Sequence, residues 1–362
     1  MHNELPSYDQ APAGAIRFNT DSNKLEVYIG GPVGYGTLPN GQWMQVDNWS
    51  PENQTGGTRG LFGGGYAPSP AGDINTIEYV NVDSTGNSID FGDLTYYPRE
   101  CGGGASRTRG VFGGGYAGPG PNSSPTVSNT INYVTISSTG NAADFGDLTQ
   151  ARVGLNALSN DTRGIFNNGF TTGPVTRRNT LDYITIASTG NAQDFGDTSA
   201  VKNGATTCAS KTRGIIAGGS TPTNINTIEF VTISTLGDTA DFGDLTSLPA
   251  GSAGGSNSVR GVFMGGYLAP SNGFLDVIDY ITIATLGNAV DFGNLVSARR
   301  QMVSSATSPV RSVIAGGQVP GGGMDNVIQY IQIPSLGDAI DFGDLTAARK
   351  IVTAISNGHG GL

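Results

Sequence analysis

The chain is short of charge, and most of the charge it has is acidic. Charged residues make up 13% of its 362 residues, about half the usual share, and the formal net charge is −10. A protein that binds duplex nucleic acid needs a basic surface that displaces counterions. The composition therefore argues against nucleic acid as a partner.

Histidine, cysteine and long apolar runs are also scarce. The only histidines, His2 and His359, lie near the chain ends, so we expect no histidine base in the body of the protein. No stretch approaches the 18 apolar residues of a membrane span, and residues 1–4 open no signal peptide. Cys101 and Cys208 fall in different repeats and are interpreted as unpaired core thiols. We expect a soluble protein made in a reducing compartment, without membrane insertion.

Glycine, by contrast, is abundant, and one phrase recurs throughout the chain. Glycine accounts for 57 residues, about twice the average usage. Asp-Phe-Gly followed by Asp or Asn occurs six times at intervals of 47 to 54 residues, with its aromatic residue at Phe91, Phe145, Phe195, Phe242, Phe292 and Phe342. A period near fifty residues indicates a propeller, solenoid or array, whose units bury their apolar faces on one another.

Each unit contains four apolar segments. The first follows a basic residue in five copies, and the second opens with Arg-Gly in five copies and ends in a glycine cluster such as 63–65. The third reads Ile-x-Tyr-Val-x-Ile, as at 131–136, with apolar residues of both parities, which predicts a strand buried on both faces. A turn such as Thr85-Gly86-Asn87 separates it from the Asp-Phe-Gly segment.

Four short antiparallel strands without helical periodicity predict one blade of a β-propeller. The order of basic residue, strand with a double glycine, strand with tyrosine and final aromatic strand resembles kelch repeats over residues 58 to 356. The fold class predicted is all-β: a six-bladed kelch-like propeller of four-stranded blades over 51–362, preceded by a small β-meander over 1–50. Because the first unit lacks a first strand, we expect 349–356 to pair beside 59–65 and to complete blade one.

The N-terminal segment does not fit the repeat. Residues 15–19 and 24–28 read as a hairpin, and 42–46 as a third strand; three such strands need something to pack on. This segment resembles the meander of tail-fibre proteins of tailed bacteriophages, and the repeats resemble arrays in virion proteins of marine phages. The resemblance implies a virion protein, assembled in the host cytoplasm and present in many copies.

No motif predicts catalysis, a cofactor or a metal. Asp-Phe-Gly lacks the other kinase motifs, and the glycine runs lack the ending of a phosphate loop. The paired aspartates, such as Asp90 with Asp93, are candidates for calcium. The favoured interpretation is that they cap turns or pair with the arginine of Arg-Gly. A glycosidase that uses only carboxylates stays open as an alternative.

The copies differ most in the loops between second and third strands. Alternating strand direction places these loops on the same face as the connections between fourth and first strands, and variable loops on a rigid scaffold are where recognition is usually built. The candidate binding residues, for a glycan or a protein, are Tyr66, Tyr96, Tyr97, Tyr116, Phe170, Arg177, Arg178 and Tyr267.

The function expected is that of a non-enzymatic virion structural protein, tail-fibre or tail-associated. The N-terminal segment docks to other virion proteins, and the propeller contacts a protein or a host-surface glycan. The alternatives are a capsid decoration protein, a cellular kelch-like interaction module and a glycan-processing enzyme.

Overall fold

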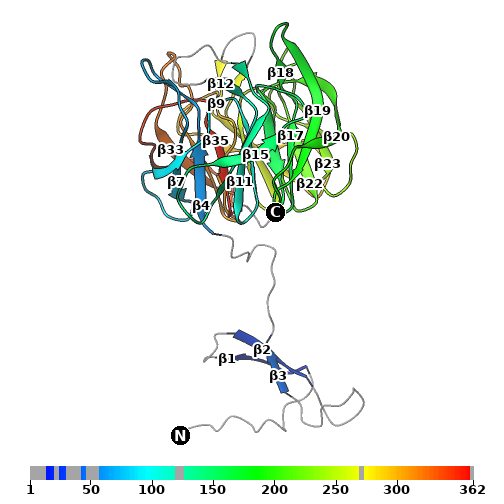
Figure 1. Ribbon diagram of the computed structural model, residues 1–362. Helices are drawn as coiled ribbons and strands as arrows, with labels where there is room; N and C mark the ends of the chain where they lie inside the picture. Colours follow the sequence, from blue (N-terminus) through cyan, green and yellow to red (C-terminus); the bar gives the residue numbers. More distant parts are fainter. Residues whose placement is uncertain are drawn as a thin grey trace. The chain divides into compact units, whose positions relative to one another are not determined.

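The computed structural model describes residues 14–19, 24–29, 42–45, 57–118, 126–268 and 273–358. The chain divides into two compact units, Met1–Asn53 and Gln54–Leu362. Both are built from antiparallel strands, and the described residues contain no helix (Figure 1). His2 and His359 lie outside the described residues.

The first unit is a three-stranded antiparallel meander. Its strands β1 (Ile16–Asn19), β2 (Lys24–Ile29) and β3 (Gln42–Gln45) pair in chain order. On one face Tyr28 is buried against the edge of Trp43, and Arg17 stacks over Trp43 at 4.3 Å and pairs with Glu26 at 2.7 Å. The predicted hairpin and third strand are confirmed.

Among its described residues the second unit has six principal sheets, here numbered in chain order. Five have four strands, and sheet 3 has a fifth, the short β18 (Phe170–Thr171). Sheet 1 consists of β35 (Thr353–Ser356), β4 (Arg59–Gly63), β7 (Thr76–Asn81) and β8 (Ile89–Asp93). Sheet 2 consists of β10 (Gly102–Ala105), β11 (Arg109–Gly113), β14 (Thr130–Thr135) and β15 (Ala143–Asp147). Sheet 3 consists of β16 (Asn156–Ser159), β17 (Arg163–Asn167), β19 (Thr176–Thr185) and β20 (Gln193–Lys202).

The remaining sheets repeat the same order of strands. Sheet 4 consists of β21 (Thr206–Ala209), β22 (Arg213–Ala217), β23 (Thr227–Thr232) and β24 (Ala240–Asp244). Sheet 5 consists of β25 (Ala253–Ser256), β26 (Arg260–Met264), β29 (Val277–Thr282) and β30 (Val290–Asn294). Sheet 6 consists of β31 (Ala306–Thr307), β32 (Arg311–Ala315), β33 (Val327–Gln332) and β34 (Ile340–Asp344).

Short strands extend the loops at one end of the sheets. They are β5 (Tyr66–Ala67), β6 (Gly72–Asp73), β9 (Tyr97–Arg99), β12 (Tyr116–Gly118), β13 (Thr126–Val127), β18 (Phe170–Thr171), β27 (Tyr267–Leu268) and β28 (Gly273–Phe274). The first strands of the six sheets contact one another in the series β35, β10, β16, β21, β25, β31, which returns to β35. The fold is therefore all-β and propeller-like.

The chain end completes the first sheet, as predicted. Strand β35 pairs antiparallel with β4, with Thr353 opposite Gly63 and Ser356 opposite Gly60 (Figure 1). Behind this pair Ile355 packs with Leu61 and Phe112, so the contact includes sheet 2 as well.

Neighbouring sheets are joined by the two phrases that the sequence repeats. The turn of one sheet donates Gly140 N–H to the carbonyl of Phe91 in the preceding sheet at 2.8 Å, and the Asn141 side chain accepts from Asp93 N–H at 3.0 Å. The glycine of the Asp-Phe-Gly phrase allows this approach, since a Cβ on Gly92 (φ +147°) would lie 2.5 Å from the carbonyl oxygen of Gly140. All six junctions have the glycine-to-phenylalanine bond and the side-chain cap.

The arginine of each Arg-Gly forms a second junction, which differs from the prediction that it pairs with the repeated aspartates. Arg59 stacks over Tyr79 of its own sheet at 4.6 Å and donates to the carbonyl of Ile136 in the next sheet at 2.9 Å. The equivalent arginines are Arg109, Arg163, Arg213, Arg260 and Arg311, and each makes both contacts. The repeated arginine therefore acts across the junction between sheets.

The glycine clusters also differ from expectation, because their last two residues follow the strand and do not lie within it. Gly64 and Gly65 have φ values of +63° and +109°, and the N–H of Gly65 donates to the carbonyl of Pro98 in the next sheet. In the third copy Asn168 and Gly169 take the same left-handed backbone, as their residue types predicted.

The core consists of six apolar clusters, each shared by two adjacent sheets. In every sheet the third-strand aromatic, such as Tyr79, meets the buried ring of the Asp-Phe-Gly phrase, such as Phe91, edge to face at about 6 Å. Cys101 and Cys208 are buried free thiols, which confirms their interpretation. Burial raises the pKa of Cys101 to about 11.

The variable residue of Ile-x-Tyr is buried between sheets, which the sequence did not predict. In each case it accepts a hydrogen bond from a backbone N–H just after the Asp-Phe-Gly phrase of the preceding sheet. The six residues are Glu78, Asn132, Asp182, Glu229, Asp279 and Gln329. Three of the carboxylates face a buried cation. The pairs are Arg152 with Asp182 at 2.6 Å, Lys202 with Glu229 at 2.6 Å and Arg349 with Glu78 at 3.1 Å.

The other three sheets lack this ion pair, each in a different way. In sheets 2 and 5 a proline, Pro98 or Pro249, stands at the position that a cation has in the other sheets. The equivalence follows from the backbone, because the carbonyl at this position accepts a hydrogen bond from the glycine cluster of the preceding sheet. Sheet 2 matches its proline with the neutral Asn132, whereas sheet 5 keeps the carboxyl of Asp279. In sheet 6 the buried residue of Ile-x-Tyr is the neutral Gln329, and Arg299 pairs with Asp325 at 3.1 Å.

Deleting residues 349–362 should expose the edge of β4 and remove Arg349 from Glu78. An unpaired strand edge promotes association, and a buried carboxylate without its cation is destabilising. We expect a product that aggregates or is cut rapidly in limited proteolysis, compared with the full chain by size-exclusion chromatography. A monomeric truncation as protease-resistant as the full chain would contradict the structural role of β35.

Breaking the ion pair of sheet 3 should cost much more than breaking an exposed one. Arg152 and Asp182 have no exposed side-chain surface, so we expect Arg152→Met to lower the free energy of unfolding by about 3–5 kcal/mol in urea titrations. The double variant Arg152→Met/Asp182→Asn, which imitates the neutral pairing of sheet 2, should recover most of the loss. The control Arg107→Met removes the exposed pair with Asp161 and should cost less than about 1 kcal/mol. Equal losses at both arginines would contradict the assignment.

Asp279 should make sheet 5 more stable in acid than at neutral pH. Burial raises its pKa above the ordinary 3.8, although Thr246 donates two hydrogen bonds to the carboxyl. The folded state therefore binds the proton of the Asp279 carboxyl more tightly than the unfolded state does. The contribution of this group to the free energy of unfolding is present at low pH and is lost as the pH rises from 3.8 through the raised pKa. Asp279→Asn should raise the urea midpoint at pH 7, with the gain shrinking toward pH 4.

The reverse change in sheet 2 provides the control for this prediction. Asn132 accepts from the N–H and the hydroxyl of Thr95, both at 2.8 Å, as Asp279 does from Thr246. Asn132→Asp should therefore lower the urea midpoint at pH 7. A loss of stability at pH 7 in Asp279→Asn would overturn the account.

Candidate functional site

The variable loops and the connections between sheets meet at one end of the second unit. Each loop after a second strand forms a bridge to the residue that precedes a first strand: Tyr66 to Lys350, Tyr116 to Arg99, Phe170 to Val153, Ser220 to Asn203, Tyr267 to Ala250 and Gln318 to Arg300. These twelve residues are here called the mouth residues. The predicted common face is therefore present.

Six left-handed residues follow the bridges and surround the central space. They are Glu100, Gly154, Gly204, Gly251, Gln301 and Ile351, with φ between +56° and +67°. Backbone hydrogen bonds link them from sheet to sheet, for example Gly204 N–H to the carbonyl of Gly154 at 2.9 Å and Ile351 N–H to that of Gln301 at 2.7 Å. Glycine is the natural residue for this backbone, so Glu100, Gln301 and Ile351 retain side chains at a cost in strain.

These residues border a cavity of about 170 Å³, here called the mouth cavity. The apolar residues that line it include Leu155, Met302, Val303 and Ile351, of which Leu155 and Met302 also belong to the core clusters between sheets. The polar residues that line it include Glu100, Asn203, Ser252, Tyr267 and Gln301. The cavity has room for roughly ten waters or one ring-sized molecule. A concave pocket that combines apolar residues with a few polar groups is typical of a small-ligand site.

Asn156 lines the mouth cavity and makes a hydrogen bond across the central space. Its side-chain Nδ2 donates to the carbonyl of Val303 at 2.7 Å. This bond joins sheets 3 and 6, which are not neighbours in the series of sheets, so it spans the central space.

Glu100 supplies the one carboxylate among the described residues that line the mouth cavity. Burial raises its pKa, and the positive charges of Arg99 and Lys350 oppose the rise. Burial also lowers the pKa of Lys350, with help from Arg300 and Arg99. A carboxyl in this setting binds a proton or a hydroxyl donor more readily than an exposed one.

Gln301 and Asn203 present amide groups to the same space. The Gln301 Oε1 is buried and makes no hydrogen bond to the described residues. The Asn203 Oδ1 accepts from Arg177 Nε at 2.8 Å, which fixes the orientation of the amide. An unsatisfied buried acceptor is costly, so the Gln301 oxygen is a candidate ligand contact.

Arginine side chains stack on aromatic rings at the mouth. Arg99 lies over Tyr116 at 4.9 Å and Tyr66 at 5.4 Å, and it pairs with the buried Asp73 at 3.3 Å. Tyr116 in turn meets Phe170 edge to face at 6.4 Å. These contacts hold loops of three sheets against one another.

A second stack lies at sheets 5 and 6. Arg300 lies over Phe274 at 4.7 Å and Tyr267 at 5.4 Å, and it donates to Gln318 Oε1 at 3.0 Å. Like Arg99, it is held by groups of the protein and does not line the mouth cavity.

The structure brings most of the sequence-predicted site residues to the mouth, with unequal exposure. Tyr66, Tyr116, Phe170 and Tyr267 are mouth residues, and all four are half-buried. The Tyr96 hydroxyl donates to the carbonyl of Gly114 at 2.8 Å, and burial raises its pKa, so it holds the loop from within. Tyr97 lies in β9 opposite Gly118.

The remaining two candidates lie on β19. Arg177 lies opposite Phe170 and orients Asn203, as described above, whereas Arg178 lies opposite Lys202. Parts of two predicted loops, 119–125 and 269–272, lie outside the described residues.

Sequence reasoning missed Glu100, Asn203, Ser252 and Gln301. The signal available was positional: three of the six left-handed positions have glycine, and Glu100 and Gln301 replace it with polar side chains. Their equivalence becomes visible only when the strands are paired. The inner strands differ in length, and sheet 6 has only two residues in its first strand.

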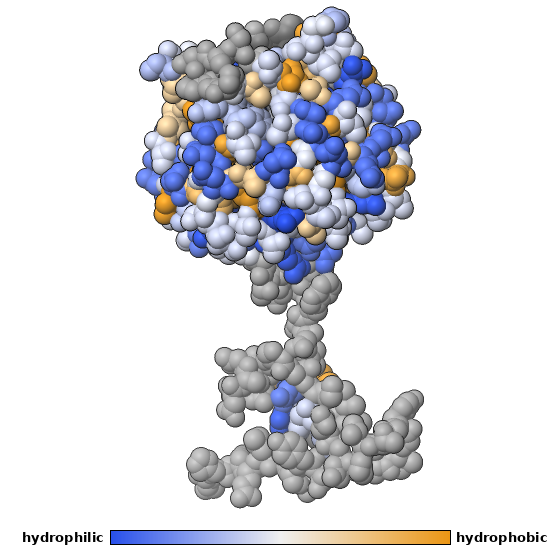
Figure 2. All heavy atoms as spheres, viewed as in Figure 1, coloured by the Kyte–Doolittle hydropathy of each residue, from blue (hydrophilic) through white to orange (hydrophobic). Residues whose placement is uncertain are grey.

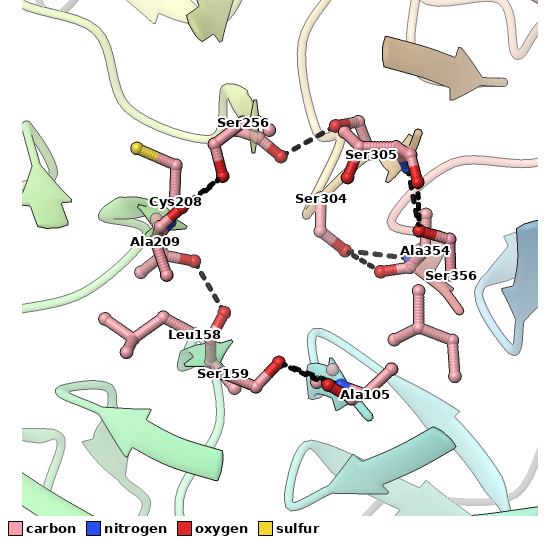
Figure 3. A pocket seen from close by; sticks show the side chains of 18 residues that line it. Ala105, Leu158, Ser159, Cys208, Ala209, Ser256, Ser304, Ser305, Ala354 and Ser356 are labelled. Carbon is pink, nitrogen blue, oxygen red and sulfur yellow. Dashed lines mark hydrogen bonds between the residues drawn. The ribbon is translucent and has the colours of Figure 1, made fainter. Parts of the chain in front are cut away.

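A second, smaller cavity of about 60 Å³ lies among the first strands of the sheets (Figure 3). Four serines here each bond both the N–H and the carbonyl of one residue: Ser159 with Ala105, Ser256 with Ala209, Ser304 with Ala354 and Ser356 with Thr307. Since these hydroxyls bond the protein itself, we interpret this cavity as structural.

Among the described residues, no three histidine, cysteine, aspartate or glutamate side chains gather as metal ligands would. Nor does any helix there have the length and apolar character to cross a bilayer.

The comparisons with known proteins define the class of fold. No family model matches the chain, and no curated protein sequence matches it. Among 375 similar chains of solved structures is YjhT, a kelch-like β-propeller, with a TM-score of 0.56 and 12% sequence identity over 70% of this chain and 88% of that chain. At this identity the similarity shows the fold alone, so the activity has to be argued from the site.

Proposed function

We propose that this chain is a non-enzymatic structural protein of a tailed-bacteriophage virion, tail-fibre or tail-associated. In this proposal the six sheets are the blades of a closed, six-bladed kelch-like propeller. The first unit docks to other virion proteins, and the propeller presents its mouth to a protein or to a glycan of the host surface.

The observation that carries the proposal is an exposed apolar face on the first unit. Ile16 and Phe18 are 67% and 59% exposed, and Leu25 lies opposite Phe18 on the same face. A three-stranded sheet is marginally stable alone, and exposed apolar groups clustered on one face are typical of an interaction surface. The sequence resemblance to tail-fibre meanders supports the same role.

The second unit is suited to contact because its repeated residues are used internally. The turn asparagines, the Arg-Gly arginines and the buried ion pairs all bond one sheet to the next. The hydropathy surface supports this interpretation: apolar residues are scattered over the face in view and form no broad patch there (Figure 2). We therefore assign specific contacts with a partner to the loops at the mouth.

One observation bears on the glycan-processing alternative. Glu100 has the raised pKa of a general acid, but glycosidases pair two carboxyl groups about 5–10 Å apart. The mouth cavity has one carboxylate among its described lining residues, which favours binding over hydrolysis.

The proposal predicts that the exposed face of the first unit carries attachment. Phe18→Ser, made in a phage genome that encodes this chain, should leave the protein folded but reduce its amount in purified particles at least tenfold by quantitative mass spectrometry. The control Leu336→Ser removes a side chain that is 57% exposed in a propeller turn, and it should be incorporated normally. Normal amounts of the Phe18→Ser protein in particles would move the docking surface elsewhere, and absence of the wild-type protein from particles would overturn the virion assignment.

A further inference from the structure

We propose that the mouth cavity binds one neutral sugar ring, such as a hexopyranose unit of a surface glycan. The inference rests on the proposed function, because a host-surface glycan would present such a unit to the mouth. It adds the ligand class and the residues that contact it.

The polar groups of the cavity match neutral hydroxyl groups. Glu100 offers acceptor oxygens, and Gln301 offers an acceptor that has no partner among the described residues. Asn203 offers an amide nitrogen, while its oxygen accepts from Arg177. Adjacent hydroxyls of a sugar both donate and accept, so they can satisfy this mixed set. A ligand without hydroxyls would leave the Gln301 oxygen unsatisfied.

The apolar part of the cavity matches the C–H face of a sugar ring. Val303 and Ile351 supply apolar lining, and Tyr267, on whose ring Arg300 stacks, lines the same cavity. The cavity volume of about 170 Å³ admits one ring and excludes a folded peptide. A longer glycan would continue outward past Tyr66 and Tyr116.

The charge distribution argues against an acidic sugar. Glu100 is the charged side chain of the cavity lining, and a ligand carboxylate beside it would add a like charge in a partly buried site. The cations nearby contact other groups of the protein. Arg99 contacts Asp73 and two tyrosine rings, Lys350 lies over the Tyr66 ring at 5.7 Å, and Arg300 contacts Gln318 and two aromatic rings. None of the described lining residues is a lysine or an arginine.

The test is titration of the purified full chain with methyl glycosides of neutral hexoses and, in parallel, of the corresponding uronic acids, followed by ligand-detected NMR. We expect at least one neutral glycoside to bind, and its uronic acid to bind at least tenfold more weakly. Glu100→Gln should narrow that difference, because it removes the like charge. Preferential binding of the uronic acid, or no binding of any glycoside, would overturn the proposal.

A second variant separates loss of the site from loss of the fold. Gln301→Met keeps the length of the side chain and removes an oxygen that bonds no described residue, so its urea midpoint should not fall. Its affinity for the neutral glycoside should fall at least tenfold. The control Asp83→Asn makes the same carboxyl-to-amide change as Glu100→Gln at an exposed turn after β7, and it should bind like the wild type. Unchanged affinity in Gln301→Met would show that Gln301 does not contact the sugar, and it would overturn the proposed site.

Failure of the sugar-binding proposal can be distinguished from failure of the proposed virion function. Gln301→Met should enter particles in normal amounts, because attachment is assigned to the first unit. Loss of sugar binding with normal incorporation leaves the virion role intact. Release of free sugar from a glycoside during the titration would instead favour the glycan-processing alternative.

Discussion

The junction between neighbouring sheets is the constraint on which the second unit depends. The Asp-Phe-Gly strand of one sheet receives the Gly-Asn turn of the next so closely that Gly92 has no space for a Cβ. The glycine N–H and the asparagine side chain complete the contact with hydrogen bonds to Phe91 and Asp93. Because the same contact occurs six times, both phrases recur together, and neither needs a catalytic explanation. The stacked arginine and the buried residue of Ile-x-Tyr strengthen the same junction from the other side.

The buried charges show how one junction tolerates different chemistry. Arg152 with Asp182 is a complete ion pair, Pro98 with Asn132 is neutral, and Arg299 turns to Asp325 where its usual partner is a glutamine. These three solutions avoid an unpaired buried charge, which would be costly in a low-dielectric interior. Sheet 5 is the exception, because Asp279 keeps its carboxyl beside Pro249 and has its pKa raised by burial. The repeat therefore fixes the shape of the junction more strictly than its charge.

The mouth combines this rigid frame with side chains that differ between copies. Backbone bonds between left-handed residues fix the rim, so Glu100 and Gln301 are held facing the mouth cavity by a strained backbone that glycine would adopt more easily. Strained positions that retain polar side chains are common at functional sites. The predicted aromatic residues Tyr66 and Tyr116 hold Arg99 between loops, and the groups that line the cavity come from the connections behind them.

The sequence alone determined the all-β class, the strand order within each repeat and the return of 349–356 to the first sheet. Periodicity and turn chemistry are local properties, and the missing first strand of the first unit left one partner for the last. Tertiary structure alone decided which residues face one another. The burial of Glu78 and its equivalents, the turning of the Arg-Gly arginines toward neighbouring carbonyls, and the gathering of Glu100, Asn203 and Gln301 all depend on contacts between residues of different repeats, 30 or more positions apart. A pattern within one repeat carries no information about the angle and distance at which the next repeat packs, and that packing creates the site.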